Sequence, residues 1–408
     1  MDAYVAYINL DSRPDRRAYI EAELAPVLSA LGLEAHRIAA TRRDRGDVGC
    51  GLSHIRALTA GLKSGRKHVL VFEDDFQWEC PTEEAAKNIR SLLSGEPADF
   101  NVVALSFYTG SVKCQPATVL NGVRVAEACN TQTTPGYIVQ REFIKTLGCN
   151  FAEAIAGLKL NKDKDVYSID QYWKRLQVPG NLFYTTVPRL GRQRAGASDI
   201  QKKFVCYGST CFIVVLSCEK YESRRAVQDM SRAPVRYRYF LGDPGIAEAR
   251  ESGNLVYLPC ADNYESLTTK VELALQWVLE KYPLTDYVFK TDDDTTINFG
   301  VFANAMYSNE RNGTDYAGYP SRSSRLVGTD HQGKCSCDEL NKTGIILPQK
   351  IRYFSGGGYF LSKKAIQLRL SMKAEDKYIY EDYTTGMALK DSNIKRRVIN
   401  NIARLVIW

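Results

Sequence analysis

Two clusters of carboxylate residues follow short apolar segments, one in each half of the chain. The segments read HVLVFEDDF at residues 68–76 and DYVFKTDDDTTIN at residues 286–298. Their acids are Glu73, Asp74 and Asp75 in the first and Asp292, Asp293 and Asp294 in the second. Adjacent carboxylates repel one another, and a hard divalent cation lets them stay ionised together. The two clusters therefore predict two metal-dependent sites, although a solvated acidic loop is the simpler alternative for the first.

Buried strands are needed to position these acids. An apolar run bounded by charge is typical of a strand in a parallel sheet, and open α/β sheets bind ligands just beyond the carboxyl ends of such strands. Each half begins with a strand-like segment, at residues 3–10 and 211–217, and then has a helix that carries an arginine pair. Amphipathic helices at residues 52–62 and 267–278 precede the acidic strands. This alternation predicts two α/β domains with mostly parallel sheets.

Length and composition agree with two soluble domains. A chain of 408 residues exceeds the usual size of one domain, and 44% apolar residues suffice for two cores. The segment at residues 187–203 is basic and contains glycine, as linkers often do, but composition leaves its role undecided. We place the break between residues 201 and 209, which gives domains at 1–201 and 210–408.

Charge and the N-terminal segment limit the partners and the compartment. The net charge of +7 suits an anionic substrate, and its dispersed basic residues argue against a nucleic-acid partner. Eleven cysteines cannot all pair within the chain. A strand begins almost at Met1, without a leader or transmembrane segment before it. We therefore expect a soluble, cytoplasmic protein, whose oligomeric state the sequence leaves open.

The segment GCGLSHIRAL at residues 49–58 offers a second feature in the first half. Its glycines and apolar spacing predict the start of a helix. Backbone N–H groups at a helix start favour anions such as a diphosphate, which makes Ser53 and His54 candidate ligand-binding residues. The alternative for His54 is a purely structural role.

The first half resembles glycosyltransferase family 25. The matching motifs are YINLDSRPDRR (residues 7–17), GCGLSHIRAL, VFEDD (71–75), TPGYIVQREF (134–143), SIDQYW (168–173) and PRLGRQRAGASDI (188–200). The resemblance covers residues 1–201. It implies a GT-A-type, Rossmann-like nucleotide-sugar fold, a UDP-sugar donor and inversion at the anomeric carbon.

This resemblance also assigns roles to residues of the first half. Asp74 and Asp75 would hold Mn²⁺ or Mg²⁺ against the donor diphosphate. The residues near the nucleotide would be Asn9, Arg13 and Arg16. Asp170 is the candidate base or second acidic contact, although an aspartate that opens a helix can instead cap it. The basic tail, with Gln193, Ser198 and Asp199, would fold back over the donor.

The second half adds two motifs to its acidic strand. Gly356 to Gly358 lie between apolar runs in IRYFSGGGYFLSKKAI, where glycine permits close approach of the backbone to a ligand. An ordinary tight turn is the alternative. Glu381 and Asp382 begin the helix-like segment EDYTTGMAL, where acids also complement the helix dipole.

Together these motifs resemble glycosyltransferase family 31, the β-1,3-galactosyl- and N-acetylglucosaminyltransferases that include the fringe enzymes. The resemblance covers residues 211–395 and also rests on SCEKYESRRAV (217–227) and DNYESLTTKVELALQWV (262–278). It implies a metal site at Asp292, Asp293 and Asp294 and a catalytic base at Asp382. Donor contacts are assigned to Arg224, Lys270, Gly356 and Gly357. The chain departs from the family at Tyr383, where a hydrophobic residue is usual, and in lacking a membrane anchor in the printed sequence.

The two resemblances together predict a bifunctional inverting glycosyltransferase. It would transfer galactose, or else N-acetylglucosamine or glucose, from UDP-sugars to a glycan or glycoprotein acceptor in β-linkage. In the first alternative only the C-terminal domain is active and the N-terminal domain is a binding or scaffold module. A metal-dependent phosphoryl-transfer enzyme is the second alternative, because clustered carboxylates also serve two-metal sites.

Overall fold

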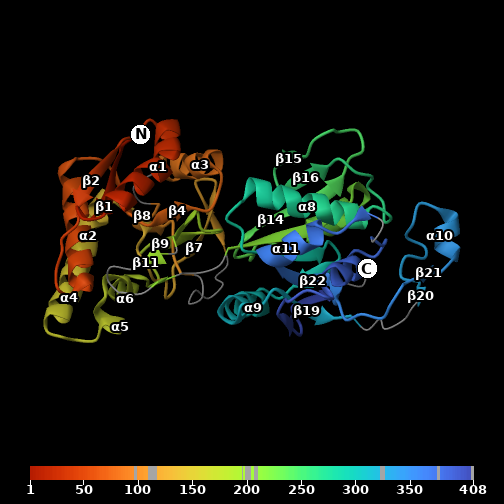
Figure 1. Ribbon diagram of the computed structural model, residues 1–408. Coiled ribbons are helices and arrows are strands. Elements are labelled where there is room, and N and C mark those ends of the chain that lie inside the picture. The colour runs from red at the N-terminus through yellow and green to blue at the C-terminus, as the bar shows by residue number, and fades with distance from the viewer. Residues whose placement is uncertain are drawn as a thin grey trace. The chain divides into compact units, whose positions relative to one another are not determined.

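The computed structural model describes residues 1–95, 99–108, 117–194, 196–197, 204–205, 210–321, 327–374 and 377–405. The chain forms two compact units, Met1–Gly208 and Ser209–Trp408. In Figure 1 the first unit runs from red to yellow-green and the second from green to blue. Their boundary falls within the interval of residues 201–209 that the sequence indicated. Among the described residues, no helix combines the length and apolar character needed to cross a membrane.

The first unit is built on a mixed sheet with the strand order β2-β1-β3-β8-β5-β9-β7-β6. These strands are β1 (Ala3–Asn9), β2 (Ala35–Ala39), β3 (His68–Glu73), β5 (Val102–Ala104), β6 (Thr118–Leu120), β7 (Val123–Glu127), β8 (Gly136–Gln140) and β9 (Phe183–Thr186). β1 pairs in parallel with β2 and β3, whereas β8 runs antiparallel to β3 and β5. The expected parallel pairing is therefore found at β2-β1-β3 and between β5 and β9, and the antiparallel pairing of the other neighbours corrects the rest of that prediction.

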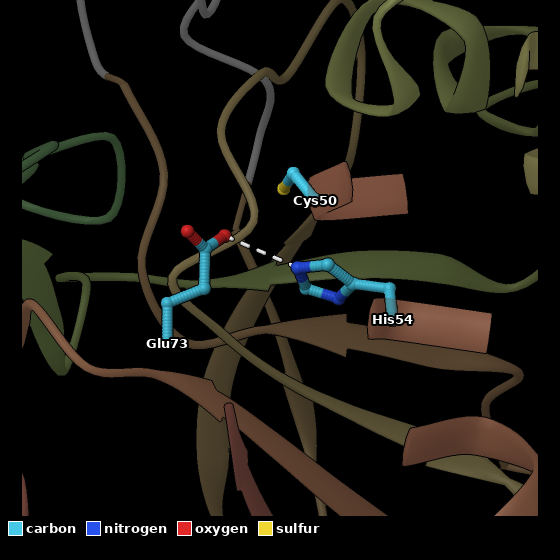
Figure 2. A group of neighbouring side chains, drawn as sticks. All are labelled: Cys50, His54 and Glu73. Carbon is cyan, nitrogen blue, oxygen red and sulfur yellow. Dashed lines mark ion pairs between the residues drawn. The ribbon is translucent and has the colours of Figure 1, made fainter. Parts of the chain in front are cut away.

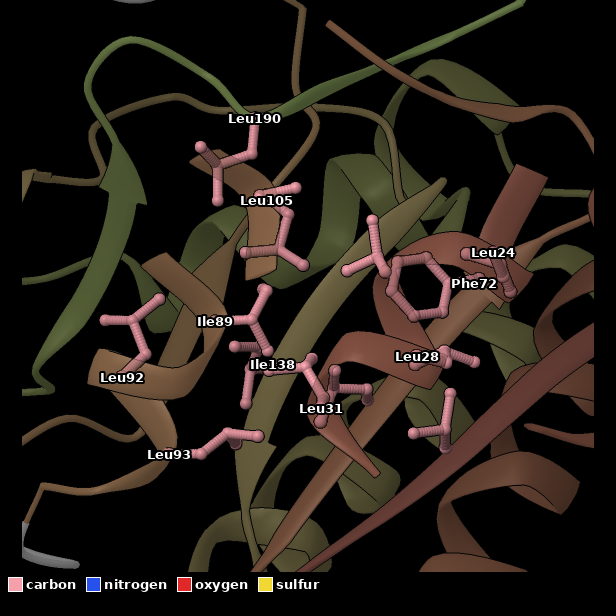
Figure 3. Packing of buried hydrophobic residues seen from close by; sticks show 14 of the residues in the cluster. Leu24, Leu28, Leu31, Phe72, Ile89, Leu92, Leu93, Leu105, Ile138 and Leu190 are labelled. Atoms are coloured by element: carbon pink, nitrogen blue, oxygen red, sulfur yellow. The ribbon is translucent and has the colours of Figure 1, made fainter. Parts of the chain in front are cut away.

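Helices cover both faces of this sheet (Figure 1). The helices α1 (Pro14–Leu31) and α3 (Thr82–Leu93) pack on one face, and α2 (Gly46–Lys63) and α4 (Ile144–Lys159) pack on the other. Figure 3 shows the first face, where Leu24 and Leu28 of α1 lie near Phe72 of β3 and Ile89 of α3 lies near Ile138 of β8. The smaller elements are β4 (Phe76–Trp78), α5 (Lys164–Tyr167), α6 (Ile169–Tyr172), β10 (Gly191–Gln193), β11 (Gly196–Ala197) and β12 (Phe204–Val205).

The pleat of β3 divides its side chains between these two cores. Leu70 and Phe72 lie in the core with α1 and α3, whereas Val69 and Val71 lie in the core with α2 and α4. Successive side chains of a strand point to opposite faces of the sheet. The strand ends at Glu73, so the alternation sets the side toward which that carboxylate points.

The second unit has a sheet with the strand order β15-β16-β14-β13-β17-β22-β19-β23. These strands are β13 (Cys211–Leu216), β14 (Arg236–Gly242), β15 (Arg250–Ser252), β16 (Leu255–Leu258), β17 (Tyr287–Asp292), β19 (Tyr316–Pro320), β22 (Phe354–Ser362) and β23 (Arg396–Val398). Pairing is parallel through β16, β14, β13 and β17, and β22 is antiparallel to β17 and β19. The acidic strand β17 thus lies at the junction of the parallel and antiparallel parts.

Helices again cover both faces of the sheet. The helices α8 (Leu267–Lys281), α11 (Lys363–Leu370) and α12 (Glu381–Leu389) contribute to one core, and α9 (Phe299–Asn312) contributes to the other. The predicted amphipathic face of α8 is confirmed, because Val271, Ala274, Leu275 and Val278 are buried. The remaining elements are α7 (Glu222–Val227), β18 (Thr295–Ile297), β20 (Val327–Gly328), α10 (Asp338–Lys342), β21 (Ile345–Ile346) and β24 (Ala403–Leu405).

Candidate active sites

The acidic turn of the second unit lies at the carboxyl end of β17. Ser217 Oγ donates a hydrogen bond to Asp293 Oδ2 (2.6 Å). Arg224 Nη1 lies 3.6 Å from Asp293 Oδ1 and 3.7 Å from Asp294 Oδ2. Asp294 Oδ1 is buried and has no hydrogen-bond partner within the described part of the chain. An unsatisfied carboxylate oxygen beside two further acids fits a hard divalent cation.

Electrostatics support the same conclusion about these acids. Burial raises the pKa of both Asp293 and Asp294, and the charge of Asp292 raises both further. Two partly buried carboxylates side by side are therefore costly to ionise unless a positive charge is present. Arg224 supplies part of that charge from its place over the Tyr221 ring, 3.7 Å from the ring centre.

A buried lysine connects the acidic strand to the two other motifs of this unit. Lys290 Nζ donates to Asp292 Oδ1 and to the carbonyl of Gly356, both at 2.7 Å, and it also bonds to Glu381 Oε1. The other oxygen of Glu381 accepts from Tyr359 OH (2.7 Å). Lys290 has 1% of its side chain exposed, so its charge is neutralised by these carboxylates. The three motifs therefore form one site.

Asp382 is the second residue of α12 and lies beside this network. Its Oδ2 accepts from the backbone N–H of Gly356 (3.1 Å), and its Oδ1 accepts from the N–H of Tyr383 (2.8 Å). Burial and the neighbouring charge of Glu381 raise the pKa of Asp382 to about 7. A carboxylate with such a pKa is suited to accept a proton near neutral pH.

The three glycines of β22 continue the strand instead of forming a turn. Gly358 pairs with Thr291 of β17, so the tight-turn alternative is wrong. A Cβ atom at Gly356 would lie 2.9 Å from Glu381 Oε1 and 3.2 Å from Lys290 Nζ. The Cβ position at Gly356 is therefore taken by the protein's own charged groups, and the donor contact assigned to Gly356 stays a prediction. The donor contact assigned to Gly357 stays a prediction.

Lys270 and Tyr383 have structural partners. Lys270 is buried, and its Nζ donates to Ser217 O (2.9 Å) and Asp262 Oδ1 (2.5 Å). It thus holds the loop after β13, whose Ser217 contacts Asp293, and the donor contact assigned to Lys270 stays a prediction. Tyr383 is 1% exposed, and its hydroxyl donates to Gln349 O (2.8 Å). The departure at Tyr383 therefore anchors the loop at Gln349.

The first unit also has an acidic turn, between β3 and β4. Asn9 Nδ2 donates to Asp74 Oδ2 (2.8 Å), and Arg16 Nη1 lies 3.0 Å from Asp74 Oδ1 and 3.4 Å from Asp75 Oδ2. Gln193 Nε2 donates to Asp75 Oδ2 (3.0 Å). Asp75 Oδ1 is buried without a hydrogen-bond partner among the residues described. Burial and the charge of Glu73 raise the pKa of Asp75 to about 7, and this pair of carboxylates also fits a divalent cation.

Arg13 and the basic segment were also predicted near this turn, and Asn9 Nδ2 donates to Arg13 O (3.1 Å). The guanidinium of Arg13 pairs with Asp15 (2.9 Å), which lies on the exposed first turn of α1. Gln193 lies in β10, which pairs with β4 beside the acidic turn, so this part of the basic segment belongs to the first unit and is no linker. Ser198 and Asp199 lie outside the described residues.

The helix predicted to start at residue 49 is present, but it begins earlier, at Gly46. Ser53 Oγ donates to Gly49 O (2.7 Å) and accepts from Thr41 N–H (2.8 Å), and Ser53 is buried. A Cβ atom on Gly49 would lie 2.3 Å from Thr41 O. Residues 49–58 are therefore helix interior, where the glycine allows close packing and offers no free N–H groups to a diphosphate.

His54 belongs to α2, which covers one face of the sheet, whereas Arg16, which contacts the Asp74 carboxylate, belongs to α1 on the other face. It is fully buried; its Nδ1 is 3.1 Å from Tyr137 OH and its Nε2 is 3.3 Å from Glu73 Oε1. Asp170 Oδ2 accepts from Thr133 N–H (3.2 Å) in a neighbouring loop instead of capping its own helix. Burial and the charge of Glu73 raise the pKa of Asp170. Whether Asp170 is a base stays a prediction.

Sequence reasoning missed Lys290 and Arg37. A lysine inside the apolar strand YVFKTD lies two residues before Asp292 and hence on the same face, which is a signal that could have identified it. Arg37 Nε donates to Asn9 Oδ1 (3.3 Å). Its partnership follows from the pairing of β1 with β2, and no motif in the sequence indicates it.

Comparison with known proteins finds similarity in the second unit. Residues 243–400 match the family described as Galactosyltransferase. UDP-GalNAc:beta-1,3-N-acetylgalactosaminyltransferase 1 of Rattus norvegicus is 30% identical over 141 residues, which are 34% of this chain and 40% of that protein. Beta-1,3-galactosyltransferase 4 of Rattus norvegicus is 23% identical over 231 residues, 45% of this chain and 61% of that protein. The chain thus spans about 40% of the length of the first of these relatives.

The second half of the chain is therefore similar to galactosyltransferases, as its motifs indicated. The resemblance of residues 1–201 to glycosyltransferase family 25 stays a prediction, because the family match lies within the second unit. Among solved structures, a glycosyltransferase involved in the glycosylation of the major capsid of PBCV-1 aligns with 49% of this chain and 96% of its own. Its sequence identity is 10% and the TM-score is 0.33, which is too low to establish a shared fold.

Proposed function

We propose that the second unit is a metal-dependent, inverting glycosyltransferase that transfers a hexose from a UDP-sugar to a glycan or glycoprotein acceptor. The observation that carries this proposal is the Lys290 network. It joins the acidic turn to the segment that holds Asp382, so a cation-binding group and a proton acceptor share one site. Galactose is the first choice of sugar, with N-acetylglucosamine and glucose as the alternatives that the sequence suggested. The name of one relative adds N-acetylgalactosamine to these alternatives.

The residues of this site have separable tasks. Asp293 and Asp294 would hold Mn²⁺ or Mg²⁺, with Asp292 beside them. The cation would supply positive charge for the departing UDP. Arg224, which already lies near both acids, adds a second positive charge on the same side. Asp382 takes the proton of the acceptor hydroxyl as its oxygen attacks C1 and the bond to the UDP oxygen breaks. One displacement inverts C1 and gives a β-linkage from an α-linked donor.

Glu381 is the less suitable base of the two acids that begin α12. One of its oxygens is bonded to Lys290 and the other to Tyr359, and the residue is 5% exposed. Asp382 is less buried and holds its oxygens with backbone N–H groups, which fix its orientation. The proton acceptor is therefore assigned to Asp382, and the like charge of Glu381 beside it raises its pKa.

The first unit has a second site of the same kind, at Asp74 and Asp75. Its buried, unsatisfied carboxylate oxygen and the adjacent Arg16 support a second UDP-sugar site and thus a bifunctional chain. A binding or scaffold module remains the alternative for this unit, since its base is not identified by geometry. A phosphoryl-transfer enzyme has less support, because the matched relatives are sugar transferases by name.

The test is sugar transfer by the purified chain with Mn²⁺ across a panel of UDP-sugars and acceptors. Asp293→Ala should abolish the activity of the second unit, while Asp74→Ala should leave that activity intact. If Asp74→Ala removes a different donor activity, the chain is bifunctional. Failure of the chain to bind or turn over any UDP-sugar would contradict the proposal for both units.

A further inference from the structure

A cysteine, a histidine and a glutamate meet on the α2 side of β3. Cys50 and His54 lie one turn apart on α2, and Glu73 ends β3. One ligand atom from each residue lies within 4.8 Å of those of the other two. Figure 2 shows the Cys50 sulfur and the His54 ring directed toward the Glu73 carboxylate, with the ion pair of 3.3 Å drawn between His54 and Glu73.

The imidazole of His54 directs its Nε2 nitrogen toward the Glu73 carboxylate in this cluster. The side chain is fully buried, and its Nε2 has no hydrogen-bond partner among the described residues. Its Nδ1 is engaged by Tyr137 OH at 3.1 Å, which fixes the ring. This Nε2 lies 3.3 Å from Glu73 Oε1 without forming a hydrogen bond to it, so an ion bound between the two atoms would use the lone pair of each. Engagement of the second ring nitrogen by another group is usual for histidine ligands of metals.

The cluster is distinct from the acidic turn, although Glu73 and Asp74 are neighbours in sequence. Glu73 continues the face of β3 that includes Val71 and packs against α2. Asp74 instead contacts Asn9 and Arg16, at the ends of β1 and α1. The two carboxylates therefore have separate partners, as the alternation of side chains along a strand requires.

We propose that Cys50, His54 and Glu73 bind a transition-metal ion of the Zn²⁺ type, with the fourth position open to water or a substrate oxygen. Thiolate, imidazole and carboxylate are ligands that Zn²⁺ accepts, and three protein ligands with one open position are typical of its catalytic sites. Tetrahedral bonds of roughly 2.0–2.1 Å place two light ligand atoms about 3.3 Å apart. The Nε2–Oε1 separation of 3.3 Å matches this edge.

Local charge favours a cation at this position. The carboxylates of Glu73, Asp170 and Asp75 lie close enough to act on the Cys50 thiol with their negative charge. The same negative potential attracts a divalent ion. On binding, the Cys50 S–H bond breaks, its proton leaves to solvent, and the sulfur lone pair forms the bond to the metal without any change in oxidation state. Thr134 Oγ1 donates to Glu73 Oε1 (2.8 Å) and orients this ligand.

Cobalt binding by the full-length chain tests the site independently of catalysis. Co²⁺ should bind and give a thiolate-to-cobalt charge-transfer band in the near ultraviolet, which oxygen-ligand sites such as the acidic turns cannot give. Zn²⁺ should displace it, because Zn²⁺ binds such ligands more tightly than Co²⁺. Cys50→Ser should abolish the band, whereas Cys149→Ser, at an exposed cysteine of α4, should keep it.

Two further variants separate a metal site from a merely structural cluster. Glu73→Gln should keep the band but weaken Co²⁺ affinity, and Tyr137→Phe should lower that affinity roughly 10–100-fold through the His54 ring. Circular dichroism before titration checks that each variant is folded. Absence of the band in the wild-type chain, or its persistence in folded Cys50→Ser, would overturn the proposal.

Discussion

At the scale of single residues, the second site depends on how one buried charge is compensated. Lys290 lies within an apolar strand and is neutralised by Asp292 and Glu381. The same ammonium donates to the carbonyl oxygen of Gly356, and the backbone N–H of Gly356 donates to Asp382. The position of the proposed base is thus set by a lysine that itself need not touch the substrate.

Replacement of the proposed base should separate binding from turnover. Asp382→Asn keeps the size of the side chain but removes its ability to accept a proton, so transfer by the second unit should fall roughly 10²–10⁴-fold. UDP-sugar affinity, measured by calorimetry, should stay near that of the wild type. Asp391→Asn is the matched control, because Asp391 is exposed and remote from the network. Loss of donor affinity with unchanged turnover would contradict the role of Asp382.

The raised pKa of Asp382 predicts a pH dependence. Below its pKa of about 7 the carboxyl is protonated and cannot act as a base, and above it the ionised form can. The transfer rate should therefore rise as pH increases through about 7. This limb should be absent from the residual activity of Asp382→Asn. A rate that is flat across this range in the wild type would show that Asp382 does not limit the reaction.

Loss of the buried lysine should destabilise the second unit. Lys290→Met leaves Glu381 and Asp292 without their counter-charge, and removal of one partner of a buried ion pair costs about 3–5 kcal/mol. The free energy of unfolding, measured with denaturant, should recover partly in the double variant Lys290→Met with Glu381→Gln, because the glutamine is neutral. Equal stability of the wild type and Lys290→Met would contradict the network.

At the scale of elements, glycines set how closely helices and strands approach. Gly49 allows α2 to pass the backbone at Thr41, and Gly358 allows β22 to pass Phe289, whose Cζ would lie 2.8 Å from an added Cβ. Both glycines lie inside regular elements, where they lack the positive φ of a turn. Their function is to remove a side chain from a crowded place.

Two glycines in the helices of the first unit should respond oppositely to alanine. Gly49→Ala places its Cβ 2.3 Å from the Thr41 carbonyl oxygen and should destabilise the unit by about 1–3 kcal/mol. Gly148→Ala in α4 meets nothing within 4 Å and should stabilise it by about 0.5–1 kcal/mol through helix propensity. Thermal unfolding followed by circular dichroism measures both, and a stabilising Gly49→Ala would contradict the packing argument.

At the scale of the whole molecule, each unit has its own hydrophobic cores. The cores with α1, α2, α3 and α4 belong to the first unit, and those with α8, α9, α11 and α12 belong to the second. Each unit also has its own acidic turn. Folding and chemistry are therefore expected to be separable.

The second unit should fold when expressed alone. A fragment of residues 209–408 should show the near-ultraviolet circular dichroism of packed aromatic side chains, and it should unfold cooperatively. It should also retain any activity that Asp293→Ala abolishes in the full chain. The same fragment with Asp293→Ala serves as its inactive, folded control. A fragment that is unfolded, or folded but inactive, would show that the second unit requires the first.

The sequence alone determined the features that arise from local pattern. The apolar runs before the acids predicted β3 and β17, and helical spacing predicted the buried face of α8, because both patterns depend on periodicity within one segment. The order of motifs in the second half also indicated the galactosyltransferase class that residues 243–400 match. The acids of both turns were identified because they directly follow these apolar runs.

Only the tertiary structure decided which residues meet. The start of α2, the strand through Gly356, and the partners of Lys290 and His54 depend on contacts between segments far apart in the chain. The antiparallel addition of β8 and β22 to their sheets depends on long-range pairing as well. Local pattern is blind to these contacts, because a residue's partners across a sheet or helix interface are selected by packing and by the compensation of buried charge.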